Sequence, residues 1–449
     1  MQHAARRSRE TSGAALAGVP VALENLILNI DALDAEGRGV ARNAEGKVVF
    51  VEGALPSERA TVRLFKEKRK FDLGRATSIV ERSAGRREPR CPHFGVCGGC
   101  ATQHADERTQ MAAKQRWLED CLERIGKVKP ETLLPIVYGP EWGYRHRARL
   151  SVRHVQSRGA MVGFRERRST HVADMHECHV LPEGISALIS PLRALVENLS
   201  IRERLPQIEV AVGDNAVVLV FRHLLPLTDA DHLALKDFSE RHQIHVWLQP
   251  AGPDSAHPFH PEASELHYDL PEFGVRIRFR PTEFTQVNFA MNRVLVSRAL
   301  RLLDPQPGER IADLFCGLGN FSLPLAAKGA QVVGFEGSAG LVERARQNAA
   351  ANGLVAQFEA VDLFKHGIAA FGPFDKLLID PPREGAVEIV KSLPETWPRR
   401  VVYVSCDPAT LARDAAVLVH TKGWRLAAAG VVNMFPHTAH VESIALFEK

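Results

Sequence analysis

The sequence predicts an α/β protein with three domains: a small β-barrel, a central α/β domain and a C-terminal domain built on a mostly parallel sheet. Its 449 residues exceed what one hydrophobic core normally supports. Short alternating runs separated by turns fill the first part of the chain, whereas strand and helix patterns alternate with glycine loops after about residue 281. We therefore expect a disordered tail, residues 1–20, followed by domains at residues 21–83, 84–280 and 281–449.

Composition and charge restrict the class of protein further. With 45% hydrophobic and 24% charged residues, the chain has the composition of a globular protein. No run approaches the roughly 18 apolar residues of a membrane span, so we expect a cytoplasmic protein with no membrane partner. Residues 1–90 carry 17 Lys or Arg against 12 Asp or Glu, and residues 141–170 carry eight Arg against two Glu. This asymmetry favours a polyanion-binding protein with a separate enzyme body; ordinary solvated charged surfaces are the alternative.

The first domain has the pattern of a small all-β barrel. Runs such as NLILNI, KVVFVEG, RATVRLF and GRATSIV are separated by glycine or charged turns. The basic run KEKRK, from Lys66 to Lys70, lies between two of these runs, where it could follow a phosphate backbone. The stretch GRGVARNAEGKVVFVEGALPSE resembles a TRAM domain, an OB-like RNA-binding module of RNA-modifying enzymes. A small barrel with no nucleic-acid role is the alternative.

Four of the seven cysteines suggest a metal site. An odd number of cysteines in a chain without a signal peptide argues against a disulfide framework. Cys91, Cys97 and Cys100 stand at C-x5-C-x2-C spacing, and Cys178 could supply a fourth ligand from a distant strand. Four thiolates indicate either a structural zinc ion or a 4Fe–4S cluster, and the spacing does not choose between them. Three nearby histidines could give a mixed ligand set: His93, His176 and His179.

A helix is expected next, from about residue 105 to residue 125, because apolar residues recur there at three- and four-residue spacing. Cys121 lies in this apolar stripe, and we interpret it as a core residue of a helix that could pack on the catalytic domain. Strand-like runs interleaved with at least two helices then predict the central α/β domain; these runs are RARLSVRHV, AMVGFRE, QIEVAVG, AVVLVFR, IHVWLQP and VRIRFR.

The C-terminal domain begins with a pattern typical of cofactor binding. The buried-strand run RIADL leads into FCGLGNFSLPLAAKG, where glycines let the backbone approach a ligand and a helix start offers free N–H groups. The second strand ends in Glu336, which could accept hydrogen bonds from both ribose hydroxyls, and the third ends near Asp362, placed to meet an adenine edge. This order resembles the class I, Rossmann-like fold of S-adenosylmethionine-dependent methyltransferases; an NAD enzyme is the alternative for the loop alone.

Two later strings carry the groups for covalent chemistry. The strand in VVYVSCDPATLARD places Cys406 at the carboxyl end of the sheet, where doubly wound folds bind ligands and a helix start could favour its thiolate. Glu442 lies in FPHTAHVE. A carbon such as C5 of uracil is too weak a nucleophile to take a methyl group unaided. Its methylation needs a thiolate that adds to C6 and a base that removes the C5 proton, and Cys406 and Glu442 are residues of the right kind.

Together, the strings DLFCGLGNF, DPPR, SCDPATLARD and FPHTAHVE resemble the RNA uracil-C5 methyltransferase family. The resemblance implies that Cys406 is the nucleophile and Glu442 the base. It also implies a set of cofactor-binding residues: Gln286, Phe315, Asn320, Glu336, Asp362 and Asp380. Asp380 could contact either the methyl donor or the uracil edge. Where the family usually has Asn after the nucleophile, this chain has Asp407, while Cys406 and Pro408 are kept.

Other residues compete for these roles. Cys316 is the alternative nucleophile, although it lies in the cofactor loop, beside the methionine moiety rather than across the acceptor ring. His437 and His440 flank Glu442 and could act as the base, although an ordinary polar role in the loop is expected of each. Phe284, just before Gln286, is either a residue that stacks on a base or a core phenylalanine.

The cysteine set after a TRAM module resembles the subgroup that acts on 23S rRNA. That resemblance implies a 4Fe–4S cluster bound by Cys91, Cys97, Cys100 and Cys178, and a 23S rRNA substrate of the uracil-1939 type. We expect a monomer in which the barrel and an arginine-rich segment hold the RNA while the target uridine is flipped out. The segment contains Arg145, Arg147, Arg149 and Arg153. A tRNA uracil-C5 methyltransferase and a non-catalytic RNA-binding sensor or assembly factor are the rival hypotheses.

Overall fold

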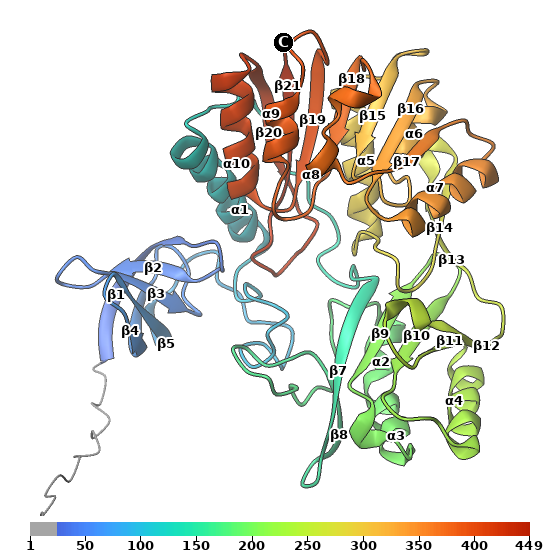
Figure 1. Ribbon diagram of the computed structural model, residues 1–449. Coiled ribbons are helices and arrows are strands. Elements are labelled where there is room, and N and C mark those ends of the chain that lie inside the picture. The colour runs from blue at the N-terminus through green and yellow to red at the C-terminus, as the bar shows by residue number, and fades with distance from the viewer. Residues whose placement is uncertain (1–24) are drawn as a thin grey trace, which may run out of the picture. The chain divides into compact units, whose positions relative to one another are not determined.

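The computed structural model describes residues 25–449, and the chain forms two compact units. The first unit comprises residues 25–32 and 39–82, and the second comprises residues 33–38 and 83–449. Figure 1 shows the course of the chain through both. The predicted disordered tail and the first four residues of the predicted barrel domain lie outside the described residues.

The first unit is a closed five-stranded barrel, as predicted, with the strand order β1-β2-β3-β5-β4. Alternate residues of each strand point inward, and Val49, Val51, Ala60 and Val62 are fully buried in its core. The predicted basic loop forms the tip of the hairpin between β4 and β5. The strands are β1 (Asn25–Leu33), β2 (Gly39–Arg42), β3 (Val48–Glu52), β4 (Arg59–Glu67) and β5 (Phe71–Glu81).

The central part of the second unit is a six-stranded sheet with the order β12-β11-β10-β9-β7-β8, covered by three helices. A short hairpin of β13 and β14 follows, and its buried side chains pack in the same core as the next helix, α5. The strands are β7 (Arg147–Val155), β8 (Gly159–Gly163), β9 (Gln207–Val212), β10 (Val217–Arg222), β11 (His245–Gln249), β12 (His257–His260), β13 (Leu266–Leu270) and β14 (Val275–Phe279). The helices are α2 (Glu183–Ala187), α3 (Ile189–Asn198) and α4 (Asp229–His242).

The C-terminal part is built on an eight-stranded sheet with the order β17-β16-β15-β18-β19-β21-β20-β6. Strands β15 to β19 run parallel, whereas β21 runs antiparallel to both of its neighbours. The order reverses between β15 and β18, which is where doubly wound sheets bind ligands. The strands are β6 (Thr132–Leu133), β15 (Arg310–Leu314), β16 (Gln331–Glu336), β17 (Gln357–Ala360), β18 (Lys376–Ile379), β19 (Arg400–Ser405), β20 (Arg425–Val432) and β21 (Glu442–Glu448).

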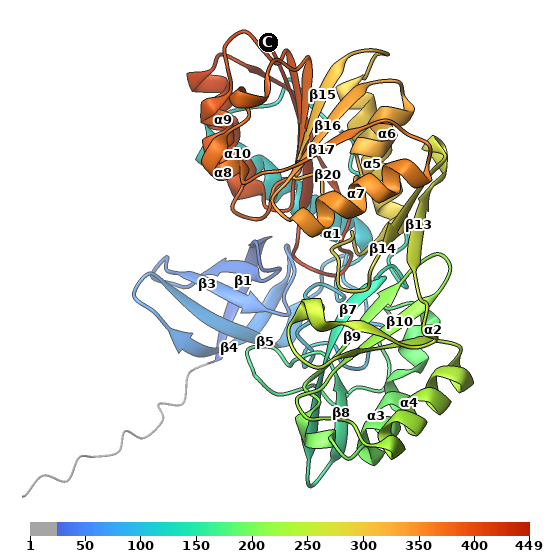
Figure 2. The ribbon, with the colours of Figure 1, turned by 45° about the vertical axis from the view of Figure 1, so that its right-hand side comes forward.

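Helices cover both faces of this sheet, and each face has its own hydrophobic core (Figure 2). The helices α5 and α6 lie on one side, whereas α9, α10 and α1 lie on the other. The predicted α/β fold with a mostly parallel sheet is therefore confirmed. The helices are α5 (Phe289–Leu303), α6 (Ser322–Ala327), α7 (Ala339–Ala351), α8 (Leu363–His366), α9 (Val387–Ser392) and α10 (Pro408–Ala416).

Helix α1 (Glu107–Cys121) comes early in the chain but belongs to the core of the C-terminal sheet. Its start is fixed by Asp106, whose side chain accepts a hydrogen bond from the backbone N–H of Thr109 (2.8 Å). Leu118 and Cys121 are buried against residues of α10 and β20. Cys121 is thus a core residue, as predicted. In the described part of the chain, no helix is both long and apolar enough to cross a bilayer.

Candidate functional site

The cofactor loop after β15 is a tight turn held against the end of β16. Phe315 has a φ of +64°, which is uncommon for a residue other than glycine, and Gly319 has a φ of +90°. The backbone N–H of Gly317 donates to the Glu336 carboxylate (3.2 Å), and the N–H of Ser338 donates to its other oxygen (3.0 Å). The structure thus brings Phe315 and Glu336, two of the predicted cofactor residues, to the same edge of the sheet.

The alternative nucleophile, Cys316, is enclosed beneath this loop. It is only 4% exposed, and burial raises the pKa of its thiol well above the usual value. A Cβ atom added to Gly334 on the neighbouring strand would lie 2.9 Å from the Cys316 sulfur and 2.6 Å from the Phe358 ring. Cys316 therefore fills a packed site, and its sulfur has no open side from which to attack a substrate.

Three other predicted cofactor residues lie in different surroundings. The Asn320 amide oxygen accepts hydrogen bonds from the Tyr268 hydroxyl (2.9 Å) and the Asn292 amide (2.8 Å), which hold the start of α6 against the core. Asp362 begins α8 and pairs with Lys365 (3.0 Å), which lowers the pKa of its carboxyl group. Gln286 is half-buried in the segment between β14 and α5. Asn320 is thus anchored by protein contacts, whereas Asp362 stays at the edge of the site.

Strand pairing brings Cys406 and Glu442 together. Strands β19 and β21 are antiparallel, and Ser405 lies opposite Ser443. Because antiparallel registers advance in opposite directions, the next pair of residues is Cys406 and Glu442. Cys406 is partly exposed, whereas Glu442 is 3% exposed. The two residues that the sequence predicts for the covalent cycle therefore meet at the carboxyl edge of the sheet.

Asp407 has a local structural role that explains why it can replace the usual asparagine. Its side chain caps α10 by accepting a hydrogen bond from the backbone N–H of Ala409 (2.8 Å), and Pro408 occupies the first turn. Asp and Asn are comparably good N-caps, so the turn that presents Cys406 does not depend on which of them is present.

The charges around Cys406 oppose its ionisation. Burial, and then the carboxyl groups of Glu442 and Asp380, raise the pKa of the Cys406 thiol to about 11, while Arg383 acts in the opposite direction. Burial and the nearby Asp313 raise the pKa of Asp380 to about 7, and burial followed by Asp380 raises the pKa of Glu442 well above its usual value. The expectation that the helix start favours the thiolate is not met, because burial and the acidic neighbours outweigh any such effect on the pKa of Cys406.

The two histidines beside Glu442 differ sharply. His437 is fully buried, its ring is stacked on Trp142 (centroids 4.0 Å apart), and burial lowers its pKa to about 3. His440 is exposed, and its Nδ1 atom lies 3.4 Å from the Arg383 guanidinium. Phe284 is 69% exposed, so its predicted alternative as a core residue is wrong. Of the three candidate bases, Glu442 is the one paired in register with Cys406.

The four predicted metal-binding cysteines line one cavity. Its volume is about 230 Å³, and its walls also contain Arg145, Thr438 and His440. The backbone carbonyl of Cys100 accepts a hydrogen bond from the Arg167 guanidinium, which fixes one wall. Within residues 25–449, no group of three or more His, Cys, Asp or Glu side chains is arranged to hold a metal ion. The lining cysteines are Cys91, Cys97, Cys100 and Cys178.

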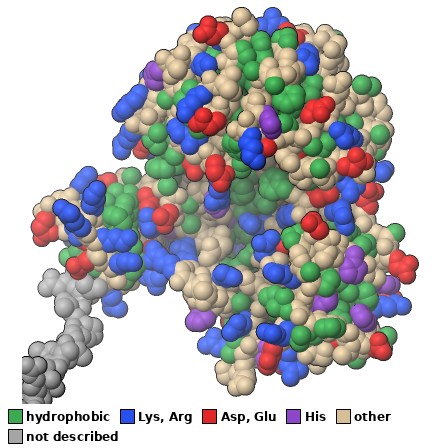
Figure 3. All heavy atoms as spheres, in the orientation of Figure 1, with side chains coloured by type: hydrophobic (Ala, Val, Ile, Leu, Met, Phe, Trp, Pro, Cys, Tyr) green, Lys and Arg blue, Asp and Glu red, His purple; other side chains and the backbone are tan. Residues whose placement is uncertain are grey.

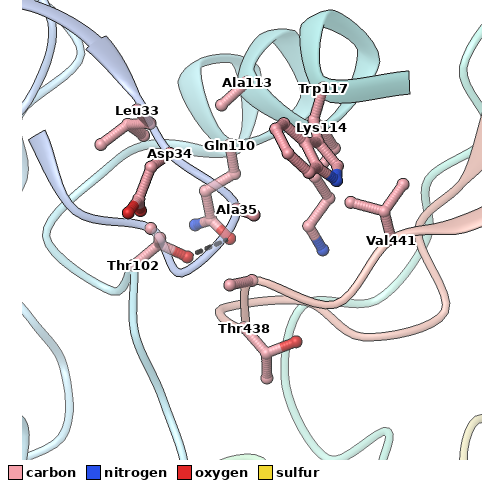
Figure 4. A pocket seen from close by; sticks show the side chains of 12 residues that line it. Leu33, Asp34, Ala35, Thr102, Gln110, Ala113, Lys114, Trp117, Thr438 and Val441 are labelled. Carbon is pink, nitrogen blue, oxygen red and sulfur yellow. Dashed lines mark hydrogen bonds between the residues drawn. The ribbon is translucent and has the colours of Figure 1, made fainter. Parts of the chain in front are cut away.

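Two polar residues of α1 that no sequence motif singled out contact the loop before Glu442. Lys114 is 5% exposed, and its ammonium group donates to the Asn433 side chain (2.8 Å) and to the Phe435 carbonyl (2.8 Å). Gln110 hydrogen-bonds to His437. Figure 4 shows both side chains pointing from α1 toward the loop that carries Thr438. The available signal was a lysine inside an apolar helical stripe, three residues after Met111 and four before Leu118.

Comparison with known proteins defines the class. The family model described as tRNA (uracil-5-)-methyltransferase matches residues 106–364 and 368–449, and a TRAM domain model matches residues 27–77. The chain therefore belongs to the RNA uracil-C5 methyltransferase family and carries an N-terminal TRAM domain, as the sequence motifs predicted.

Particular relatives are similar over nearly their whole length. A protein of Thiobacillus denitrificans is 61% identical over 95% of this chain and 100% of its own, and one of Nitrosospira multiformis is 61% identical over 94% and 98%. Both are named 23S rRNA (uracil(1939)-C(5))-methyltransferase RlmD. The fold is shared with Pyrococcus abyssi tRNA (uracil-54, C5)-methyltransferase, solved with S-adenosyl-L-homocysteine (TM-score 0.73, 24% identity, covering 94% of this chain and 100% of that one).

Proposed function

We propose that this protein uses S-adenosylmethionine to methylate C5 of one uridine in 23S rRNA, the uridine equivalent to uracil 1939 of its named relatives. The observation that carries the proposal is that Cys406 and Glu442 lie close together directly beyond the Ser405–Ser443 pair of β19 and β21, at the sheet edge that holds the cofactor loop. We propose further that the enzyme acts as a monomer in the cytoplasm.

Each residue of the pair has one task in the proposed cycle. The Cys406 thiolate adds to C6 of uracil, and the electrons of the C5=C6 bond move toward C5 and the O4 carbonyl. C5 then forms a bond to the methyl carbon, whose bond to sulfur breaks. Glu442 removes the C5 proton, the C5=C6 double bond re-forms, and the bond between C6 and the cysteine sulfur breaks. The thiolate and the methylated base are released together.

The acidic surroundings suit a cationic methyl donor. S-adenosylmethionine, when bound, supplies an electrophilic methyl group on a positively charged sulfonium. We propose that Glu336, which accepts a hydrogen bond from the loop at Gly317, binds its ribose, and that Phe315 of the same turn contacts it. A positive charge beside Asp380 and Glu442 offsets the effect of these carboxyl groups on Cys406, so its thiol ionises more easily once the donor is present. The same arrangement keeps Cys406 mostly protonated in the unliganded enzyme.

We propose that the cysteine cavity holds a 4Fe–4S cluster. The donor set fits, because four cysteine thiolates are the usual ligands of such a cluster. The four cysteines line one cavity of about 230 Å³, together with other residues such as Phe164 and Arg145. The resemblance to the 23S rRNA subgroup, made from sequence, is in accord with this assignment.

RNA binding is supported by an arginine row on β7 as well as by the TRAM domain. Arg147, Arg149 and Arg153 alternate with the buried residues Ala148 and Leu150, so they lie on one face of the strand. Arg149 also pairs with Glu209 but remains 69% exposed. Lys and Arg side chains are plentiful on the molecular face shown in Figure 3. Such rows bind phosphates without reading sequence, so the flipped uridine is selected elsewhere.

The proposal is tested by labelling with tritiated S-adenosylmethionine on separate transcripts of a 23S rRNA fragment and of tRNA. We expect label in the 23S fragment and none with Cys406→Ala, which should still bind S-adenosylmethionine with an affinity within about threefold, as measured by calorimetry. Asp407→Asn is the matched control and should stay active, because Asn caps the same helix. Label in tRNA alone would favour the rival tRNA-modifying function. Turnover by Cys406→Ala would exclude the covalent mechanism.

The metal assignment is tested on protein purified without oxygen. We expect about four iron atoms and four sulfides per chain, with most of both lost in Cys178→Ser. Cys121→Ala is the control, because Cys121 is buried in the C-terminal core and should not alter the iron content. One zinc per chain and no iron would contradict the assignment.

A further inference from the structure

The segment that carries Glu442 is held almost entirely from outside the sheet to which it belongs. We define the catalytic loop as residues 433–441, which connect β20 to β21. Its backbone carbonyls at Met434, Phe435, Pro436 and His437 accept hydrogen bonds one after another. The donors are the Asn288 amide (3.3 Å), the Lys114 ammonium (2.8 Å), the Tyr144 hydroxyl (2.9 Å), and the backbone N–H groups of Ala101 (2.8 Å) and Thr102 (3.1 Å).

His437 lies at the centre of these contacts and is held in a backbone conformation that side chains rarely adopt. Its φ is +63°, and it is fully buried. Its ring is stacked on Trp142, its Nδ1 atom lies 3.2 Å from the Gln110 amide nitrogen, and its own backbone N–H donates to the Gln110 oxygen (2.9 Å). Such a conformation persists only where its surroundings determine it, and here both the ring and the backbone are fixed.

The partners of the His437 carbonyl connect the loop to the cysteine site. Ala101 and Thr102 directly follow Cys100, whose side chain lines the cysteine cavity. On the other side, Thr438 and His440 of the catalytic loop form part of the wall of that cavity. The loop is thus hydrogen-bonded to the chain next to Cys100 and lines the same cavity as the four cysteines. Glu442 follows two residues after this wall.

We propose that His437 is a positioning residue that locks the catalytic loop to the chain following Cys100, so that the cysteine site sets where Glu442 stands over the uracil ring. The inference rests on the proposed function. Removal of the C5 proton needs Glu442 in place, whereas attack by Cys406 and methyl transfer do not. A shift of the loop therefore slows the last step selectively. The cysteine site thus affects catalysis by positioning the catalytic loop. The bonds within the cysteine site need not change during the reaction.

The test compares His437→Ala with His437→Asn and a control, His223→Ala. Asparagine tolerates positive φ and keeps a polar group for Gln110, so it should restore part of the function. His223 is a buried histidine directly after β10 whose ring hydrogen-bonds the Leu225 carbonyl, and it is remote in sequence from the loop. Thermal melting of all three variants shows whether they lose similar stability. If His437→Ala does not fold, Gln110→Ala is used instead, because it removes the hydrogen bonds between α1 and His437.

Two RNAs separate the steps of the cycle. With 5-fluorouridine RNA, proton removal is blocked, so the rate of covalent adduct formation reports attack and methyl transfer alone. We expect that rate to stay within about threefold in His437→Ala. Turnover of ordinary 23S RNA should fall by about 10- to 100-fold, and its covalent adduct should accumulate on denaturing gels. His223→Ala should neither reduce turnover to this extent nor cause the covalent adduct to accumulate. The inference would be overturned if His437→Ala slowed the reaction with both RNAs to a similar extent, or if no covalent adduct accumulated with ordinary 23S RNA. No adduct in the unaltered enzyme would overturn the proposed function itself.

Hydrogen exchange gives a readout that is independent of activity. In the metal-loaded protein, the amides of residues 434–441 should be protected. Stripping the metal with an oxidant and a chelator, or replacing His437 with Ala, should speed their exchange by at least about tenfold, while the amides of β10 stay unchanged. Unchanged protection of the loop after metal removal would contradict a link between the cysteine site and the base.

Discussion

At the scale of single residues, the surroundings of the proposed nucleophile, Cys406, oppose its ionisation. Cys406 has a pKa of about 11 because it is buried and faces Glu442 and Asp380. A reactive thiol usually has a lowered pKa and cationic neighbours, whereas here the lowering effects of Arg383 and of a backbone hydrogen bond are outweighed. In the proposed mechanism, the additional positive charge that favours ionisation comes with the methyl donor.

This electrostatic account predicts the reactivity of Cys406 toward iodoacetamide in the unliganded enzyme. Below a pKa of about 11, the alkylation rate should rise about tenfold per pH unit. Asp380→Asn removes a negative charge, so it should lower the pKa of the thiol and speed alkylation at a fixed pH. Arg383→Ala should do the opposite. Mass spectrometry of the Cys406 peptide gives the rates, with buried Cys121 as the unreactive reference; slower alkylation in Asp380→Asn would refute the charge assignment.

Local sequence strings contain the residues proposed for the chemistry, but they do not reveal the residues that hold the loop before Glu442. Cys406 and Glu442 each lie in a local string, and strand pairing then placed them side by side. The roles of Lys114, Gln110 and His437 depend on contacts between residues more than 300 positions apart. No local pattern encodes such contacts. The predicted cofactor contacts of Gln286, Phe315, Asn320, Glu336, Asp362 and Asp380 stay predictions.

At the scale of elements, strands with strong patterns could be predicted closely. The run RARLSVRHV is β7, and RIADL is β15, residue for residue. Strand β6 was missed because its two residues have no periodicity and pair only with β20. The helix predicted over residues 105–125 is not α-helical to its end: α1 ends at Cys121, and a π-helical turn, Leu122–Gly126, continues it. Long-range packing sets such features, and local propensity does not.

The hairpin between β4 and β5 yields a prediction of its own. Its basic tip is exposed and belongs to the TRAM domain. Replacing Lys66, Lys68, Arg69 and Lys70 with Ala should weaken binding of 23S RNA fragments and reduce the slope of log affinity against log salt by up to about 3. The affinity for S-adenosylmethionine should not change. Filter binding at several salt concentrations gives the slope; an unaltered slope would show that this loop contacts no phosphate.

At the scale of the whole molecule, the barrel is one compact unit and all the remaining described chain is another. The central and C-terminal parts are continuous because the β13–β14 hairpin packs in the core of α5, and α1 packs in the core of the C-terminal sheet. Composition and periodicity could predict that the chain has three segments with different arrangements of strands and helices. The apolar stripe of the helix at about residues 105–125 indicated that it could pack on the C-terminal domain, but nothing in the sequence showed that β6 would extend the C-terminal sheet.

The central claim, covalent catalysis by Cys406 on a uridine of 23S rRNA, is tested most directly with 5-fluorouridine. The enzyme is incubated with a 5-fluorouridine-substituted 23S fragment and S-adenosylmethionine, and the products are separated on a denaturing gel and mapped by peptide mass. Fluorine at C5 prevents the final proton removal, so we predict a stable methylated RNA–protein adduct attached at Cys406. Confirmed cofactor binding with no adduct on the 23S fragment, or an adduct mapped to Cys316, would contradict the account.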